Sequence, residues 1–193
     1  MSKRVKEIIS ASIEVKQKIL NDEVLLKNIC DAVNVVTDAF KNGKKVLFCG
    51  NGGSAADAQH LAAEFSGRFY KDRAALPSEA LHCNTSYLTA VANDYSYDVI
   101  YSRIIEGTGN AGDVLVGLST SGNSGNIVKA FEAAKAKGMI TIGFTGETGG
   151  KMKELSDYLF NVPSKDTPRI QESHIMIGHI ICELVETKLY PQT

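Results

Sequence analysis

Short apolar runs that alternate with helical patterns constrain the fold of this chain more than any other feature. Five runs read as strands, at residues 44–49, 79–83, 113–119, 139–145 and 158–162. Helical patterns lie near residues 54–66, 84–92, 97–108, 124–137, 149–155 and 168–189. Strands that are apolar throughout are typical of a parallel sheet covered on both faces. Because crossovers in such sheets are right-handed, we expect an α/β fold, a three-layer αβα sandwich around a five-stranded, doubly wound parallel sheet.

Residues 3–41 precede the first strand and carry two amphipathic patterns, with Asn21 and Asp22 as the break and the helix cap. Two such helices have more apolar surface than one small sheet can cover, so part of that surface is expected to form an oligomer interface. A length of 193 residues suits one domain. We therefore predict a single domain over residues 1–193, with residues 1–41 as a helical extension used in oligomerisation.

Charge, hydropathy and cysteine spacing argue against several classes of protein. A net charge of −1 gives no electrostatic reason to expect nucleic acid as a partner. No apolar run approaches the roughly 20 residues of a membrane-spanning helix, and the first ten residues show no secretory signal. Cys30, Cys49, Cys83 and Cys182 have no C-x-x-C spacing and adjoin apolar segments, so buried free thiols are expected. These features favour a cytoplasmic protein.

A glycine-rich loop, Gly50-Asn51-Gly52-Gly53, directly follows the first apolar run. Glycines let the backbone turn sharply and approach a ligand, and a helix N-terminus attracts anions. Ser54 is a good N-cap for the helix that follows. The loop lacks the third glycine of G-x-G-x-x-G, and no G-K-[ST] follows, so neither a dinucleotide site nor an NTP site is supported. Taken alone, this loop is a weak signal.

A second polar loop, Ser-Thr-Ser-Gly-Asn-Ser at residues 119–124, stands between an apolar run and a helical pattern. Hydroxyl groups and the N–H groups of a helix N-terminus can hold a phosphate, and Gly122 lets the loop close around it. An N-cap with polar neighbours is the alternative interpretation. Four hydroxyl groups in six residues favour anion binding. Both loops follow strands, at the edge where parallel sheets bind ligands.

His60 and Glu64 are four residues apart on one face of the predicted helix 54–66, as a metal site or an acid–base pair would require. An exposed helix pair is the alternative. His179 stands in an apolar stretch expected to be buried, where an imidazole needs a partner. Gln171 is about 80° from it on a helical wheel, so the two can share a face.

A further group of polar residues and two further histidines give weaker signals. Asn93, Asp94, Tyr97 and Asp98 form a polar cluster after the helical pattern 84–92. His82 and His174 lack comparable support, and we interpret them as structural or surface residues.

Six motifs follow one another along nearly the whole chain: C-G-N-G-G-S, A-x-H-x-A-x-E, A-N-D, G-D-V-L-x-G-x-S-T-S-G-N-S, T-G-x-x-G-G-K-M and R-I-Q-E-x-H. In this combination the sequence resembles the sugar isomerase (SIS) family, and within it the bacterial phosphoheptose isomerases. The resemblance implies conversion of sedoheptulose 7-phosphate to D-glycero-D-manno-heptose 7-phosphate. That reaction would be the first step toward ADP- or GDP-heptose for lipopolysaccharide or capsule.

The resemblance also implies roles for particular residues. Catalytic roles fall on Glu64 and His179. A metal site, usually zinc with one ion per subunit, falls on His60, Glu64, Gln171 and His179. Substrate contacts fall on Asn51, Gly52, Gly53, Glu64, Asn93, Asp94, Ser119, Thr120, Ser121, Ser124 and Gln171. The implied assembly is a homotetramer whose active sites lie at subunit interfaces, with a phosphorylated heptose as the small-molecule partner.

The chemistry of an aldose–ketose isomerase agrees with these residues. A carboxylate such as Glu64 can carry a proton between neighbouring carbons through an enediol, while His179 exchanges protons with the oxygens or helps to open the ring. A metal would polarise the carbonyl group. A glutamate bound to a metal is a weaker base, so it would have to loosen its coordination to act.

Two other functions compete with the isomerase. One is a non-catalytic SIS protein that binds the bacterial replication initiator; its pattern lacks the acid–base residues that this chain has at Glu64 and His179. The other is a regulatory SIS domain, which usually accompanies a DNA-binding or synthase domain, and none fits in 193 residues.

Overall fold

The sheet brings the two polar loops to one edge of the molecule. A computed structural model describes residues 1–191. Its strands are β1 (Val46–Gly50), β2 (Ser78–Ala80), β3 (Val114–Leu118), β4 (Ile140–Thr145) and β5 (Tyr158–Asn161). All pairs are parallel, in the order β2-β1-β3-β4-β5. The predicted five-stranded parallel sheet is confirmed, although the strand expected at residues 79–83 is shorter and begins one residue earlier.

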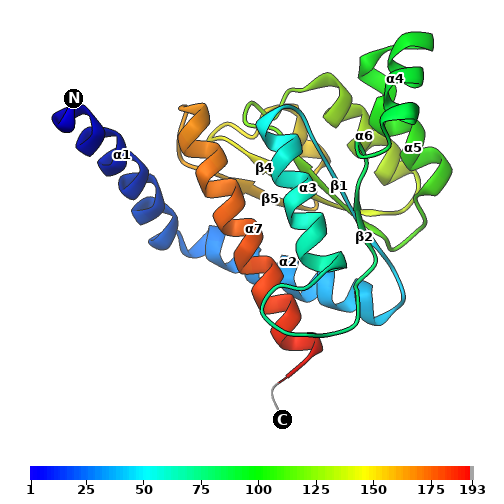
Figure 1. Cartoon of the computed structure of the whole chain (residues 1–193), viewed down its shortest axis with the longest axis horizontal. Coiled ribbons are helices and arrows are strands. Elements are labelled where there is room, and N and C mark those ends of the chain that lie inside the picture. The colour runs from blue at the N-terminus through cyan, green and yellow to red at the C-terminus, as the bar shows by residue number, and fades with distance from the viewer. Residues whose placement is uncertain (192–193) are drawn as a thin grey trace.

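Helices cover both faces of this sheet, as the sandwich requires (Figure 1). They are α1 (Ser2–Leu20), α2 (Glu23–Lys41), α3 (Gly53–Ser66), α4 (Thr85–Asp94), α5 (Ile100–Thr108), α6 (Gly125–Ala136) and α7 (Thr167–Leu189). Two short 3-10 segments are η1 (Tyr97–Val99) and η2 (Gly150–Leu155). The helical pattern 97–108 thus divides into η1 and α5, and the pattern 149–155 forms a 3-10 segment.

The pleat of β1 explains why the apolar runs are continuous. Val46 and Phe48 belong to the core beneath α2, α3 and α7, whereas Leu47 and Cys49 belong to the core beneath α5 and α6. All five residues of β1 are buried. Since successive side chains of a strand point to opposite faces, both faces need apolar residues.

The two N-terminal helices differ in how much of their apolar surface is covered. Asp22 caps α2 by accepting from the N–H groups of Val24 and Leu25, at the predicted break. α2 buries eight residues, but α1 buries only Val15 and Ile19. α1 projects from the body of the molecule (Figure 1). Its exposed large apolar residues are Val5, Ile8, Ile9, Ile13 and Leu20.

The chain leaves β1 toward one side of the sheet and β3 toward the other, since β1 is followed by β2 and β3 by β4. This change of direction defines a crevice at the carboxyl ends of two neighbouring strands, the usual ligand position in such sheets. Gly50 and Leu118, the last residues of β1 and β3, are in register. The glycine loop and the hydroxyl loop therefore begin side by side.

Two smaller expectations can be compared with the structure. Among the described residues, no helix combines the length and apolarity that a bilayer crossing would need. All four cysteines are free thiols, as expected. Their predicted burial is right for Cys49 and Cys182 but wrong for Cys30 and Cys83, which are exposed. An apolar neighbourhood in sequence does not fix which side of a helix or turn a thiol occupies.

Candidate active site

The glycine loop turns from β1 into α3 with almost no space to spare. A Cβ atom on Gly50 would lie 2.3 Å from the carbonyl oxygen of Ser54, and Gly52 has φ 55°, a left-handed conformation that favours glycine. α3 begins at Gly53 with Gly52 as the N-cap residue, so the prediction that Ser54 caps the helix is wrong. Ser54 instead lies buried within the first turn.

Gly53 makes room for Gln171 of α7. A Cβ atom at Gly53 would lie 2.7 Å from Gln171 Nε2. The missing side chain therefore lets the Gln171 amide pack against the N-terminus of α3. The structure brings this predicted site residue to the glycine loop.

The hydroxyl loop is held closed by its own side chains. Ser119 Oγ lies 2.9 Å from Ser124 Oγ and 3.5 Å from Ser121 Oγ. Ser124 is the N-cap residue of α6, yet its side chain makes no capping bond. Gly122 has φ 66°, and a Cβ atom there would lie 2.1 Å from the carbonyl oxygen of Gly149. The N–H groups in the first turn of α6 lack intrahelical acceptors, so the loop can present both hydroxyls and N–H groups to an anion.

An open pocket of about 300 Å³ borders the hydroxyl loop. Thr120 and Ser121 of the loop line it, together with Lys165 and Thr167. Lys165 Nζ is 3.2 Å from a carboxylate oxygen of Glu147 at this pocket; the Lys165 side chain is 83% exposed and that of Glu147 is 38% exposed. The pocket can admit a phosphate group to the predicted contacts at Thr120 and Ser121.

The two loops are joined by a pair of side-chain amides. Asn51 Nδ2 donates to Asn126 Oδ1 at 2.9 Å, and Asn126 Nδ2 donates to Asn51 Oδ1 at 2.8 Å. Tyr97 also donates its hydroxyl to Asn51 Oδ1, at 3.1 Å. Asn93 and Asp94 end α4 and bond to each other at 2.9 Å; both are exposed.

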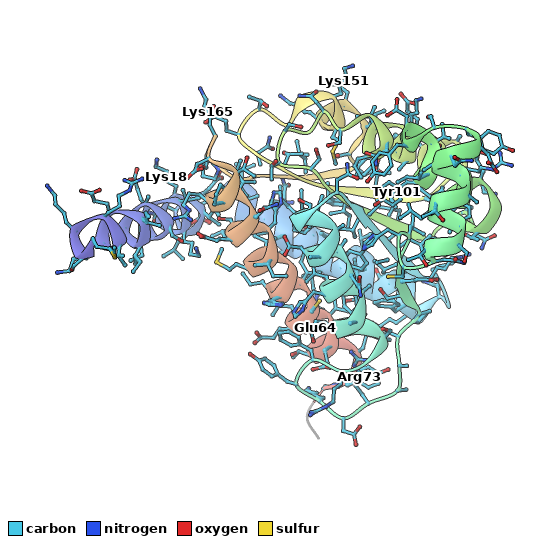
Figure 2. All side chains as sticks on the ribbon, turned by 45° about the horizontal axis from the view of Figure 1, so that its top comes forward. Lys18, Glu64, Arg73, Tyr101, Lys151 and Lys165 are labelled. Carbon is cyan, nitrogen blue, oxygen red and sulfur yellow. The ribbon has the colours of Figure 1, made fainter. Side chains whose placement is uncertain are left out.

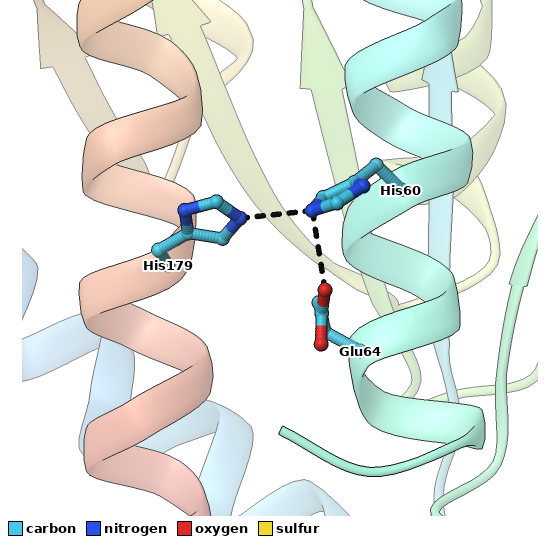
Figure 3. Close-up of side chains that lie close together, drawn as sticks. All are labelled: His60, Glu64 and His179. Carbon is cyan, nitrogen blue, oxygen red and sulfur yellow. Dashed lines mark hydrogen bonds and ion pairs between the residues drawn. The ribbon is translucent and has the colours of Figure 1, made fainter. Parts of the chain in front are cut away.

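His60, Glu64 and His179 meet between α3 and α7 (Figure 3). The Nε2 atoms of His60 and His179 are 3.0 Å apart, and His60 Nε2 is 3.1 Å from Glu64 Oε1. His60 is exposed, whereas the other two are half-buried, so the expectation of a buried segment holds only in part for His179. The helix pair predicted from the i, i+4 spacing is thus completed by an imidazole from a second helix.

The donor set of this cluster fits a divalent cation. One candidate atom from each of the three residues lies within 4.8 Å of the others. Ligands about 2.0 Å from zinc in a tetrahedron lie roughly 3.3 Å apart, close to the separations found here. His60 Nε2 carries either one hydrogen or one lone pair, so it cannot bond well to both neighbours at once. A cation would satisfy all three atoms together.

Gln171 lies away from this cluster within the subunit. It precedes His179 by eight residues in α7, which corresponds to about 12 Å along the helix axis. His60 is seven residues beyond Gly53 in α3, about 10 Å along that helix. With its amide beside Gly53, Gln171 is placed as a contact of the glycine loop, and its role as a metal ligand stays a prediction.

The sequence of this chain matches a known family of proteins. A family model described as SIS domain matches residues 9–146, well over half of the chain. The chain belongs to the SIS family.

Relatives within the SIS family extend the likeness to almost the full length. The phosphoheptose isomerase of Aneurinibacillus thermoaerophilus is 55% identical over 98% of this chain and 96% of its own length. That of Clostridium acetobutylicum is 57% identical over 94% and 93%. The solved structure of phosphoheptose isomerase from Neisseria gonorrhoeae is 42% identical with a TM-score of 0.90, covering 96% of this chain and 98% of its own.

Below the His–Glu–His cluster, a buried ion pair holds the loop that follows α3 of this SIS domain. Arg73 Nε lies 2.9 Å from Glu186 Oε1, and each side chain is 2% exposed. Arg73 also donates to the carbonyl oxygens of Glu64, Phe65 and Gly67, at the end of α3. Figure 2 shows Glu64 and Arg73 close together at this end of the helix. The pair therefore anchors the backbone that carries Glu64.

The Glu186 carboxylate is fully bonded. Its two oxygens accept the N–H groups of Phe69, Tyr70 and Lys71 in addition to Arg73. Burial raises the pKa of Glu186, but these donors outweigh it, so the pKa lies below its usual value. Asp57, one turn before His60, shows the reverse balance: burial raises its pKa more than His60 and His179 lower it.

The remaining histidines serve other ends. His174 is 0% exposed and donates from Nε2 to the carbonyl oxygen of Thr145 at 3.1 Å. Burial lowers the pKa of His174 to about 4, although the bond to Thr145 opposes the shift. His82 is half-buried near Tyr101. The interpretation of His174 as structural agrees with its burial.

Sequence reasoning missed Asn126, Tyr97 as a partner of Asn51, and the Arg73–Glu186 pair. Asn126 lies in the first turn of a helix of ordinary amphipathic pattern, and the spacing of 75 residues to Asn51 gives no local signal. Arg73 and Glu186 are 113 residues apart, with Arg73 in an irregular segment. One available signal was the position of Asn126, two residues after the last hydroxyl of the second loop.

Proposed function

We propose that the chain is a phosphoheptose isomerase, which converts sedoheptulose 7-phosphate to D-glycero-D-manno-heptose 7-phosphate. The observation that carries this proposal is the cluster of His60, Glu64 and His179, which combines a carboxylate with two imidazoles on an SIS fold. Relatives named phosphoheptose isomerase, 55% and 57% identical over nearly the whole chain, support it.

Glu64 is proposed as the group that moves the proton. The ketose carries its carbonyl at C2 and the aldose at C1, so a proton must leave C1 and return to C2 through an enediol. Glu64 is half-buried, and Arg73 donates to its backbone carbonyl oxygen, which anchors the end of α3 that carries Glu64. His179 would exchange protons with the two oxygens, or assist opening of the ring form.

The two polar loops are proposed to hold the rest of the substrate. The hydroxyls of Ser119, Thr120, Ser121 and Ser124 and the N-terminus of α6 suit the phosphate. The glycine loop, with Asn51, Gly52 and Gly53, suits the sugar hydroxyls, and Gln171 lies beside it. Asn93 and Asp94 are proposed as further sugar contacts from the end of α4.

His60, Glu64 and His179 are proposed to hold one zinc ion per subunit. When bound, a divalent ion polarises a carbonyl and stabilises negative charge on the enediol oxygen. Two imidazoles and a carboxylate are ligands that zinc favours, and three protein ligands leave a position open for substrate. Gln171 could act as a fourth ligand only if its amide left Gly53.

We propose that active sites form between subunits of a homotetramer. Glu64 lies eleven residues beyond Gly53 in α3, about 16 Å along the helix axis. A seven-carbon chain with bonds of about 1.5 Å extends only about 8 Å. The loops of one subunit and the Glu64 of another can therefore serve one substrate better than those of a single chain. The exposed apolar face of α1 offers the interface.

This assembly can be tested by deleting residues 1–20. Loss of both the tetramer in light scattering and the isomerase activity is expected. A wild-type chain that is active as a monomer of 20.8 kDa would contradict the interface and the shared site together.

A cytoplasmic enzyme of heptose precursor synthesis is the setting we propose. Four free thiols suit a reducing compartment. The product would enter the route to ADP- or GDP-heptose for lipopolysaccharide or capsule.

The decisive experiment incubates the purified protein with sedoheptulose 7-phosphate and follows formation of the aldose. Conversion that disappears in Glu64→Gln is the expected result. Absence of conversion with zinc supplied would overturn the proposed function.

A further inference from the structure

A bridge of two side-chain amides connects the glycine loop to the hydroxyl loop. Asn126 is 2% exposed and lies in the first turn of α6, two residues after Ser124. Asn51 is half-buried and lies directly after β1. The two amides exchange bonds of 2.8 and 2.9 Å across the crevice between β1 and β3.

The bridge determines which end of the Asn51 amide remains free. Asn51 Oδ1 accepts from Asn126 and from the Tyr97 hydroxyl, which uses both of its lone pairs. Asn51 Nδ2 has two hydrogens and gives one to Asn126. One N–H donor is left over. In this orientation Asn51 can donate to a ligand oxygen but cannot accept from a ligand hydroxyl.

The Asn126 amide also links the hydroxyl loop to Asn51 through helix α6. Its helix begins at the hydroxyl loop, where Ser119 and Ser124 bond to each other at 2.9 Å. A shift of α6 would move the hydroxyl loop and the Asn126 amide together, and so would move Asn51. Beyond the pairing of β1 with β3, the Asn51–Asn126 bridge therefore couples the positions of the two loops.

We propose that Asn126 is a positioning residue that holds Asn51 as a hydrogen-bond donor toward the sugar part of a sugar-phosphate ligand. This rests on the proposed function, which gives the glycine loop the sugar and the hydroxyl loop the phosphate. Asn126 acts through Asn51 and does not touch the ligand itself. Its loss weakens recognition of the sugar and leaves recognition of the phosphate as it was.

A double-mutant cycle on the full-length protein separates this role from a merely structural one. The variants are Asn126→Ala, Asn51→Ala and the double variant. Dissociation constants are measured by calorimetry for sedoheptulose 7-phosphate and, separately, for inorganic phosphate. Asn34→Ala, an exposed amide on α2, serves as the matched control. Thermal melts establish that each protein is folded; if Asn126→Ala does not fold, Asn126→Ser replaces it.

Asn126→Ala is expected to weaken sugar-phosphate binding about five- to tenfold, the range of one lost hydrogen bond. Inorganic phosphate binding should change less than about twofold. In the Asn51→Ala background the same substitution should add less than about twofold, because residues that act through one contact are not additive. Equal weakening for both ligands, or a full extra effect without Asn51, would overturn the proposal.

Failure of the proposed function gives a different result. A wild-type protein that binds sedoheptulose 7-phosphate without converting it would refute the isomerase, while the cycle would still decide the role of Asn126.

Discussion

Two glutamates occupy the contact between α3 and α7 in opposite circumstances. Glu186 is buried, and its oxygens accept four N–H donors, three from the backbone and one from Arg73. Glu64 has 22% of its side chain exposed and faces His60, whose second neighbour is another imidazole. The Glu186 carboxylate accepts four hydrogen bonds. The cluster of Glu64, His60 and His179 has fewer N–H donors than its close contacts would need.

The number of hydrogen-bond donors around each glutamate distinguishes a structural carboxylate from one that can bind a ligand. A saturated, buried network is costly to disturb and has nothing left to offer a ligand. The partly exposed cluster of His60, Glu64 and His179 still has lone pairs that can bind a cation. The two lie on the same pair of helices, and Arg73 joins them through the backbone carbonyl of Glu64. The buried Arg73–Glu186 pair thus supports the helix end that carries Glu64 of the cluster.

The largest effect should come from Glu186→Ala. It leaves the Arg73 guanidinium buried without its partner, which costs about 3–5 kcal/mol of unfolding free energy in comparable pairs. Urea unfolding followed by circular dichroism measures this loss. Glu183→Ala, an exposed neighbour on α7, is the control and should change stability by less than about 0.5 kcal/mol. A loss below 1 kcal/mol for Glu186→Ala would remove the distinction drawn between the two glutamates.

Glu64→Gln should show the opposite profile. Turnover should fall by about 10² or more because the proton-transfer group is gone, while the shape is nearly preserved. The unfolding free energy should stay within about 0.5 kcal/mol of wild type. Steady-state kinetics and the same urea titration test both parts, with Glu183→Gln as the control. Near-native turnover would exclude Glu64 from the mechanism.

Removal of one imidazole should weaken the metal site. His60→Ala and His179→Ala are each expected to reduce zinc affinity at least about tenfold, since three protein ligands tolerate little loss. Competition with a chromogenic chelator measures the affinity, and elemental analysis measures the content. His82→Ala is the control and should retain the metal. Zinc-free wild-type protein with full activity in chelator would make His60 structural.

The last effect concerns His174, a fully buried histidine whose Nε2 atom is bonded to Thr145 while its Nδ1 atom has no hydrogen-bond partner among the described residues. Its folded-state pKa is about 4, below the ordinary value of 6.5, so the unfolded chain binds a proton between these values and the folded chain does not. Stability from this group is complete above pH 6.5 and falls by about 1.4 kcal/mol per pH unit below it.

The comparison variant is His174→Gln, whose amide can still donate to the carbonyl of Thr145. Its stability should decline less steeply than that of wild type from pH 6.5 to pH 5, as measured by urea unfolding across that range. Parallel pH curves for the two proteins would refute the assignment.

The sequence predicted the features that follow from local residue patterns. It did not predict side-chain pairs between residues far apart in the chain. The five strands follow from apolar runs, and the pairing of His60 with Glu64 follows from helical spacing. The helical wheel placed Gln171 near His179 because it shows angle and ignores rise along the axis. The spacing of eight residues amounts to about 12 Å along the axis, which separates two groups that the projection places on one face.

The supports of the site had no comparable signal. Asn126 and Arg73 bond to partners 75 and 113 residues away, and one of them lies in an irregular segment. Ser54 satisfied the rule for an N-cap, but the crowding at Gly50 and the left-handed conformation of Gly52 accompany a helix that already begins at Gly53. At that position the backbone geometry of the glycine loop, and not the capping preference of serine, determines where the helix begins.

The position of α7 in the chain bears on how the protein is made. α7 supplies Gln171, His179 and Glu186 to three separate contacts around α3, and Gly178 packs against Leu61. At a synthesis rate of about 5–20 residues per second, α3 is complete on the order of ten seconds before α7. During that interval the apolar side chains of α3 that α7 later covers face solvent or a chaperone. Nascent chains halted before residue 167 should therefore be the form most prone to aggregate, because they lack both the His179 imidazole that completes the cluster and the Glu186 carboxylate that pairs with Arg73.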